Sequence, residues 1–226
     1  MSILHQFRQI SAVVEKDVRS ELRTRYGITA LGLFVVTSVT LIVFAVAEEP
    51  LPRPLAAGIL WVIMFYSAMT GLGRGFISEE ERGTALFLRL HSPLTAIFIG
   101  KLLVNVSLAL LTSLVALMLM MMFFSSVTVG SWLVMIATVT MGSIGMASVM
   151  SIVSAIVAKA GTRNPILPVL SFPMLVPLVM TGVNAMTLGL AGFSLSEASS
   201  DLLLMLTYTG LVIIVSVLVF PVVWDE

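Results

Sequence analysis

The 226-residue sequence contains no cysteine, only two histidines and few charged residues, which make up 11% of the chain. Without cysteine the protein has no disulfide, no thiolate metal site and no covalent haem attachment through a Cys-x-x-Cys-His motif. The low charge fraction and a mean hydropathy of +1.10 exclude a soluble globular domain, in which about 25% of residues are charged. The composition therefore predicts a single polytopic membrane domain.

Motifs for enzymatic chemistry are also missing. No lysine stands in a Gly-Lys-Ser/Thr sequence, so the chain lacks the P-loop of an ATPase. His5 and His91 fall outside the uncharged stretches and are expected to be solvated surface residues rather than haem or metal ligands. Lys+Arg and Asp+Glu both number 12, so no basic field favours nucleic acid. We expect no enzymatic activity from the chain by itself, and no directly bound metal, cofactor or nucleic acid.

Six uncharged stretches predict six transmembrane helices, because about 30 Å of hydrocarbon requires about 20 helical residues. These spans are expected at about 26–47, 55–73, 102–124, 131–158, 165–189 and 202–224. No ionisable residue falls inside any of them, which argues against a proton relay. The predicted fold class is an all-α integral membrane protein, in which residues 26–226 form one six-helix domain.

Positive charges are distributed unevenly around these spans. Only Arg53 lies on one side of the membrane, and the other Lys and Arg residues lie on the opposite side: Arg8, Lys16, Arg19, Arg23, Arg25, Arg74, Arg82, Arg89, Lys101, Lys159 and Arg163. Because positive residues near helix ends stay in the cytoplasm, both termini are expected to be cytoplasmic.

Residues 1–25 carry an apolar stripe at three- and four-residue spacing, formed by Ile3, Phe7, Ile10, Val14, Val18 and Leu22. This pattern predicts an amphipathic helix that lies at the membrane interface, where its basic residues meet anionic headgroups. A helix packed on a partner subunit explains the same pattern equally well.

The charged segment between the second and third spans carries the clearest local signals. Ser78 followed by Glu81 matches a capping box, three glutamates occupy the first turn, and Arg89 precedes Pro93. These signals predict one short helix from Ser78 to Leu90 along the cytoplasmic surface, with an acidic start available to a partner. A solvated connector is the open alternative.

Small residues and prolines mark the fourth and fifth spans. Ser143, Ala147, Ser151 and Ala155 recur at four-residue spacing and predict close helix packing rather than a substrate path. The fifth span contains Pro165, Pro168, Pro173 and Pro177. We expect at least one kink there, at Pro168, Pro173 or Pro177, because interior carbonyls lose their donors.

Six helices with an amphipathic first helix and a cytoplasmic helix after the second span resemble a permease of the ABC-2 or type V exporter kind. At the residue level the chain resembles the haem exporter protein B family (CcmB) of the cytochrome c maturation system. The motifs that carry this resemblance are 16–25, Gly58-Ile59-Leu60-Trp61, Glu81-Arg82-Gly83-Thr84, Ser92-Pro93, Gly100-Lys101-Leu102, Leu167-Pro168 and Phe172-Pro173.

The resemblance implies a permease subunit of the bacterial inner membrane that is driven by a separate ABC ATPase, on which ATP-Mg binds. It further implies a homodimer within a complex that contains a haem-handling membrane subunit with a tryptophan-rich segment, a small accessory membrane helix and a periplasmic haem chaperone. Haem is expected on the partner subunit, since this chain has only three tryptophans.

In this setting the helix after the second span is expected to dock on the ATPase, through Glu79, Glu80, Glu81, Arg82, Gly83, Leu86 and Phe87. Two alternatives stay open. One is an ABC-2 permease for lipid, polysaccharide or drug export, and the other is a membrane assembly scaffold that transports nothing.

Overall fold

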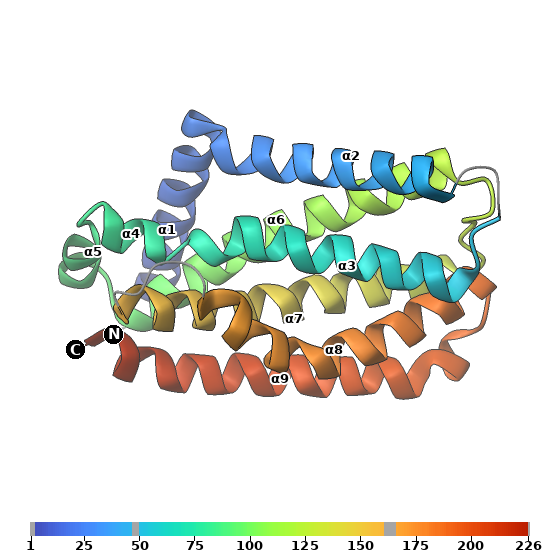
Figure 1. Ribbon diagram of the computed structural model, residues 1–226. Helices are drawn as coiled ribbons and strands as arrows, with labels where there is room; N and C mark the ends of the chain where they lie inside the picture. The colour runs from blue at the N-terminus through green and yellow to red at the C-terminus, as the bar shows by residue number, and fades with distance from the viewer. Residues whose placement is uncertain (1–2, 47–49, 161–165, 226) are drawn as a thin grey trace.

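The computed structural model describes residues 3–46, 50–160 and 166–225, with the side chains of 3–5, 24, 26 and 225 left out, and these residues contain no strand. Figure 1 shows the helices that they form. In chain order the elements are α1 (Ile3–Thr24), α2 (Tyr26–Val46), α3 (Arg53–Gly71), η1 (Leu72–Arg74), α4 (Ile77–Glu81), α5 (Ala85–His91), α6 (Leu94–Phe123), α7 (Trp132–Lys159), α8 (Ile166–Ala191) and α9 (Leu195–Asp225). The predictions for His5, Glu48, Arg163 and Pro165 concern positions or side chains outside this description.

Among the described residues, six helical stretches are long and apolar enough to cross a membrane. They are Gly27–Val46, Arg53–Glu81, Leu94–Phe123, Trp132–Lys159, Ile166–Ala191 and Leu195–Trp224. The predicted all-α membrane fold with six spans is therefore confirmed.

The helix boundaries correct one prediction. The third span begins at Leu94 rather than 102, and the sixth at Leu195 rather than 202. These longer helices also include Lys101 and Asp201, two ionisable residues that the predicted spans left out. A helix of 30 residues extends about 45 Å at 1.5 Å per residue, so its ends project beyond the hydrocarbon.

The spanning helices lie alongside one another, and α1 crosses them at one end, near α4 and α5 (Figure 1). The centre of the bundle is α7, which packs against α6, α8 and α9 and is buried along most of its length. The outermost helix is α2, which lies over α3 and α6 and has many exposed side chains. The start of α1 and the end of α9 are at the same end of the bundle (Figure 1).

The four small residues of the predicted packing stripe are all fully buried on α7: Ser143, Ala147, Ser151 and Ala155. Two of them contact α6 through hydrogen bonds. Ser143 donates to the Ser113 hydroxyl over 3.2 Å, and the Asn105 amide donates to the Ser151 hydroxyl over 2.9 Å. Such close contacts between small and polar side chains hold helices together in lipid, where the hydrophobic effect contributes little between helices.

Trp61 of α3 joins three helices at one point. Its side chain is 1% exposed and lies against two glycines, Gly142 of α7 and Gly182 of α8. A Cβ added at Gly142 would be 2.9 Å from the ring, and one added at Gly182 would overlap it. The two glycines therefore make the space that the indole ring fills.

Two prolines, Pro173 and Pro177, lie inside α8, which is visibly bent (Figure 1). Each proline lacks an N–H, so a carbonyl one turn earlier loses its donor and the helix bends. Pro168 lies in the first turn, where an N–H has no partner in the helix anyway, so it breaks no interior hydrogen bond. Beside the bend, the Tyr208 hydroxyl of α9 donates to the carbonyl of Met174.

The Trp61 contact predicts the effect of one added methyl group. Gly182→Ala should lower the thermal unfolding midpoint in detergent, because overpacking a core costs about 1–3 kcal/mol. Gly210→Ala is the matched control, since no atom lies within 4 Å of a Cβ there. Equal midpoints for the two variants would contradict the packing described.

Candidate functional site

The segment that follows the second span forms two short helices rather than one. The predicted continuous helix from Ser78 to Leu90 is wrong: α4 ends at Glu81, α5 begins at Ala85, and Gly83 between them has a φ of +67°. The predicted capping box is also wrong. Phe76 is the N-cap residue, and the Ser78 hydroxyl donates instead to the Gly75 carbonyl over 3.4 Å.

The turn that breaks this segment is a Schellman motif. The Gly83 N–H donates to the Glu80 carbonyl over 3.1 Å, and the Thr84 N–H donates to the Glu79 carbonyl over 2.9 Å. This motif requires a residue in the left-handed region, which glycine adopts without a steric penalty. Gly83 therefore ends α4 and sets the direction of α5.

A buried ammonium group lies below this turn. Lys101 of α6 has a side chain that is only 3% exposed, and its Nζ donates to three acceptors: Asp17 Oδ2 at 3.1 Å, Glu79 Oε1 at 3.0 Å and the Gly75 carbonyl at 3.0 Å. An ammonium group has three donors, so each has a partner. Burial of a charge in this position is tolerated because it is paired and hydrogen-bonded.

Two further side chains complete the arrangement. Lys16 of α1 forms ion pairs with Asp17 at 3.0 Å and with Glu79 at 2.5 Å, and the Thr84 hydroxyl donates to the second Glu79 oxygen. Burial lowers the pKa of Lys16, but the hydrogen bond to Glu79 and the two carboxylate charges outweigh it, so its pKa lies above the ordinary value. We call Lys16, Asp17, Glu79 and Lys101 the ion cluster; it joins α1, α4 and α6.

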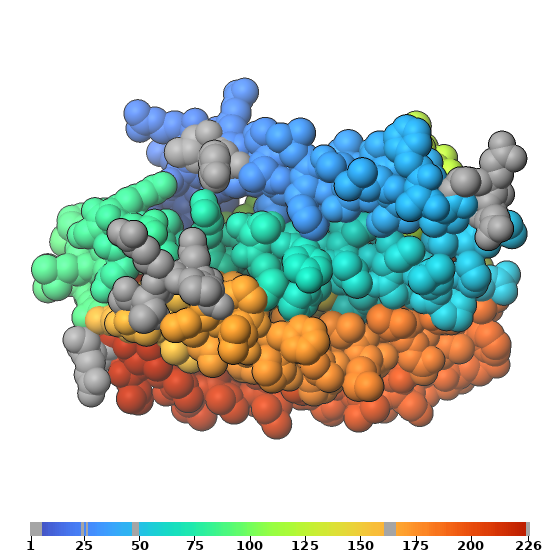
Figure 2. All heavy atoms as spheres, in the orientation of Figure 1, coloured from blue at the N-terminus to red at the C-terminus, as the bar shows by residue number. Residues whose placement is uncertain are grey.

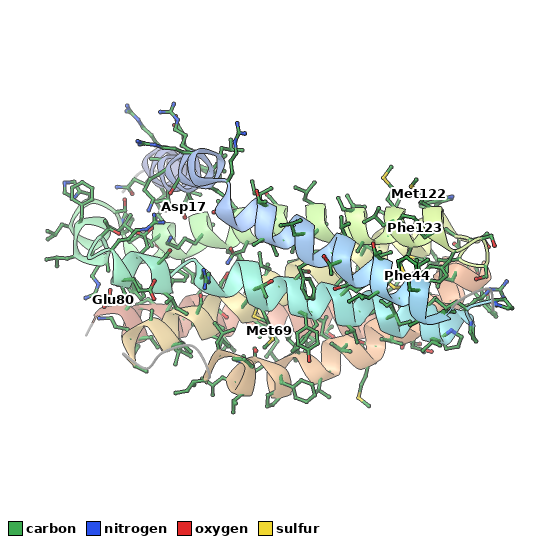
Figure 3. All side chains as sticks on the ribbon, turned by 45° about the horizontal axis from the view of Figure 1, so that its top comes forward. Asp17, Phe44, Met69, Glu80, Met122 and Phe123 are labelled. Atoms are coloured by element: carbon green, nitrogen blue, oxygen red, sulfur yellow. The ribbon has the colours of Figure 1, made fainter. Side chains whose placement is uncertain are left out.

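Close approach of α1 to α6 makes the ion cluster possible. Gly100 precedes Lys101, and a Cβ there would lie 2.7 Å from Val13 of α1, which is itself buried. The missing side chain therefore lets α1 lie directly on α6. In Figure 3, Asp17 lies between α1 and the bundle. Glu80 lies apart from Asp17, at the end of the molecule.

A second contact holds α5. Its Arg89 guanidinium lies 5.5 Å from the centroid of the buried Trp224 ring of α9, and Lys159 of α7 lies 5.9 Å from the same ring. Ala85 and Leu88 are buried beneath α5. These cation–π and apolar contacts fix one face of α5 and leave the other face outward.

The outward face contains most of the residues that the sequence assigned to ATPase docking. Exposed side chains or backbone are found at Glu80, Glu81, Arg82, Gly83, Leu86 and Phe87, and Leu90 joins them with 74% exposure. Glu79 differs, since it is 7% exposed and its carboxylate belongs to the ion cluster. His91 is exposed and stacks on Phe87 with ring centroids 4.1 Å apart.

Sequence reasoning missed three contributions to this site. Asp17 was placed only within the amphipathic helix of residues 1–25, and Lys101 only among the positive charges between the second and third spans. The Gly100-Lys101 pair directly precedes an apolar stretch and could have indicated a buried lysine. Trp224 was read only as the end of a span. No group of three or more metal-ligating side chains occurs in the part of the chain that the structure describes, and the expected absence of a directly bound cofactor stays a prediction.

A bundle of six helices that can each cross a membrane, with two short helices fixed at one end, is the architecture of a multi-pass membrane protein. The model of the family described as CcmB protein matches residues 8–223, nearly the whole chain, and the protein belongs to this family. It is thus a haem exporter permease component of the cytochrome c maturation ABC system, and it works in a complex with an ATPase partner. No curated protein matches the chain.

Removal of the buried cation should be strongly destabilising. Lys101→Met removes the buried cation and leaves Asp17 and Glu79 to the partly exposed Lys16. It should cost about 3–5 kcal/mol, seen as a lower unfolding midpoint in detergent and as faster tryptic cleavage within α1. Lys16→Met is the matched control, because its side chain is 43% exposed and a partly solvated pair contributes only about 0–1 kcal/mol. Equal losses for the two variants would contradict the central position of Lys101.

Proposed function

We propose that α1, α4 and α5 form a single unit through which the ATPase partner acts on the membrane helices. The position of Glu79 is the observation that supports this proposal. It lies on α4, yet it pairs with Lys16 of α1 and with Lys101 of α6. A permease without a nucleotide site must receive force through a contact, and a force applied to α4 would pass to both of these helices.

The outward face of α4 and α5 has the chemistry of a docking surface. Glu80 and Glu81 supply negative charge, and Leu86, Phe87 and Leu90 are 64%, 63% and 74% exposed. The helices α4 and α5, which carry these residues, lie at one end of the bundle (Figure 1). An apolar centre with charged neighbours suits a partner groove with a basic rim, because the apolar anchors supply affinity and the charges supply orientation.

The exposed stripe of α1 suits membrane lipid. Phe7, Val18 and Leu22 remain exposed, whereas Val13 and Asp17 on another face of the helix contact α6. In this proposal α1 is held to the bundle on one side while its exposed apolar side chains enter the interface between headgroups and acyl chains.

We extend the proposal to the whole complex. The subunit would form a homodimer in the bacterial inner membrane, together with the ATPase, a haem-handling membrane subunit with a tryptophan-rich segment, a small accessory membrane helix and a periplasmic haem chaperone. ATP-Mg would bind to the ATPase and haem to the haem-handling subunit. The force that the ATPase applies through α4 and α5 would then drive release of the haem-loaded chaperone.

The proposed orientation places α1, α4, α5 and the end of α9 in the cytoplasm, as the concentration of Lys and Arg at this end favours. Reporter fusions at Glu226 and beside Lys159 should therefore report cytoplasm. Fusions beside Glu48 and Glu197 should report the opposite side. External localisation of the Glu226 fusion would contradict the orientation.

The proposed docking surface predicts that charge reversal on α4 uncouples the ATPase. Replacing Glu80 and Glu81 together by Lys should weaken assembly with the ATPase or leave its hydrolysis without cytochrome c maturation, because like charge would face the basic rim. The measurements are co-purification, ATPase rate and the yield of mature cytochrome c. Glu79 is left intact, since its replacement would disturb the ion cluster.

The matched control is Glu15→Lys, which reverses an exposed acid on α1. It should leave assembly and maturation near their normal levels. If the α4 variant is normal and the Glu15 variant is defective, docking must be assigned to α1 instead.

A further inference from the structure

A cavity of about 390 Å³ lies between α3 and α8, and the function proposed above does not use it. All the residues that line it come from these two helices. On this face of the molecule the teal surface of α3 lies next to the orange surface of α8 (Figure 2). Val62 and Met180 line the cavity and are 55% and 71% exposed, so it opens on the outer surface of the bundle. The volume lies within the range of about 300–1,000 Å³ that is typical of small-ligand sites.

The bend in α8 makes this space. On one side of the bend, a Cβ added at Gly73 would lie 2.7 Å from the Leu167 side chain, and on the other side the Trp61 ring fills the space at Gly182. The chain at α3 and η1 is therefore in close contact with α8 on both sides of the bend. The two prolines inside α8 lie between these contacts, and α8 is furthest from α3 at its bend (Figure 1). The cavity is the gap that this bend leaves.

The walls of the cavity are apolar and rich in aromatic rings. None of the residues that line it is charged, and four of them are aromatic: Trp61, Phe65, Tyr66 and Phe172. The Phe65 ring meets the Tyr66 and Phe172 rings edge-on, with centroids 5.3 and 6.0 Å apart. The face of an aromatic ring carries partial negative charge. Such walls suit a flat ligand whose own ring is poor in electrons.

One polar group in this wall has no partner. The Trp61 side chain is 1% exposed, and its Nε1–H is buried without an acceptor among the residues that the structure describes. A buried donor without an acceptor is costly, so a ligand with a carbonyl group would gain a hydrogen bond there. Trp61 lies near the middle of α3, at a depth of the membrane that phospholipid headgroups do not reach. The acceptor must therefore belong to a molecule that dissolves in the hydrocarbon itself.

We propose that this cavity binds the ring of a membrane-soluble quinone. The flat, electron-poor ring would lie against the aromatic walls, and one of its carbonyls would accept the Trp61 N–H. The isoprenoid tail would pass through the opening between α3 and α8 into the lipid. Haem fits this cavity less well, because its carboxylates would find no cation among the lining residues. The proposal concerns binding and includes no redox step.

Native mass spectrometry of the purified, delipidated full chain tests this proposal with two probes that have the same tail. Decylubiquinone carries a quinone ring, whereas decylbenzene carries a ring without oxygen. At equal concentration the quinone should be retained about fivefold more, which is the difference expected for one hydrogen bond. Trp61→Phe keeps an aromatic ring but removes the N–H, so it should bring the two retentions close together.

A second variant does not depend on Trp61. Gly58 lines the cavity, and no atom lies within 4 Å of a Cβ there. Gly58→Leu therefore places a side chain in the cavity without a clash at Cβ, and it should remove most of the retention of both probes. Gly32→Leu and Gly210→Leu are the matched controls, because these two positions are equally open but do not line the cavity. They should leave retention unchanged.

Four results would overturn the proposal. The first is equal retention of the two probes by the unchanged chain, and the second is an equal effect of Gly58→Leu and its controls. The third is displacement of decylubiquinone by haem at equal concentration, which would assign the cavity to a porphyrin. The fourth comes from the oligomeric state, which the same spectra report. A change from dimer to monomer in Gly58→Leu, with quinone retention unchanged, would assign this face to a second copy of the chain.

Discussion

The buried ammonium group of Lys101 is the constraint on which the cytoplasmic arrangement depends. A lysine placed inside a spanning helix must find partners or remain costly, and its partners come from other elements, Asp17 of α1 and Glu79 of α4. The same pairs that neutralise the charge therefore fix the first helix and the turn at Gly83 relative to α6. An apolar residue at this position would also be buried, but it would not fix the positions of Asp17 and Glu79.

The rest of the bundle uses a different means of packing. Along α7, small residues admit neighbouring helices closely, and Ser151 receives a hydrogen bond from Asn105, one turn along α6 from Lys101. Trp61 fills the space beside Gly142 and Gly182. In lipid the hydrophobic effect contributes little to association between helices. Shape complementarity and hydrogen bonds between helices therefore stabilise the packing. A rigid core of this kind can transmit a displacement applied at the end of α6.

Much of the fold was predictable, because spans depend on runs of apolar residues that the sequence displays directly. The candidate site was less predictable from the sequence. The criterion of an uncharged run began the third span after Lys101, because it takes no account of a partner such as Asp17, which is 84 residues away in the sequence. The break between α4 and α5 was missed for a local reason: capping signals at Ser78 were given more weight than Gly83, which favours a left-handed conformation. Leu86 and Phe87, which the sequence assigned to docking, are exposed, whereas Leu88 of the same segment is buried; docking itself stays a prediction.

The most direct test of a single moving unit is a pair of distances measured by spin labelling in the assembled complex. The chain has no cysteine, so labels attach only where cysteine is introduced. One pair of labels joins Ser11 of α1 to His91 of α5. The other pair joins His91 to Ser199, which lies near the start of α9. The proposal predicts that, between the nucleotide-free and ATP-bound complex, the first distance stays constant while the second changes. A change in the first distance would show that α1 and α5 move separately, and would contradict the role assigned to the ion cluster.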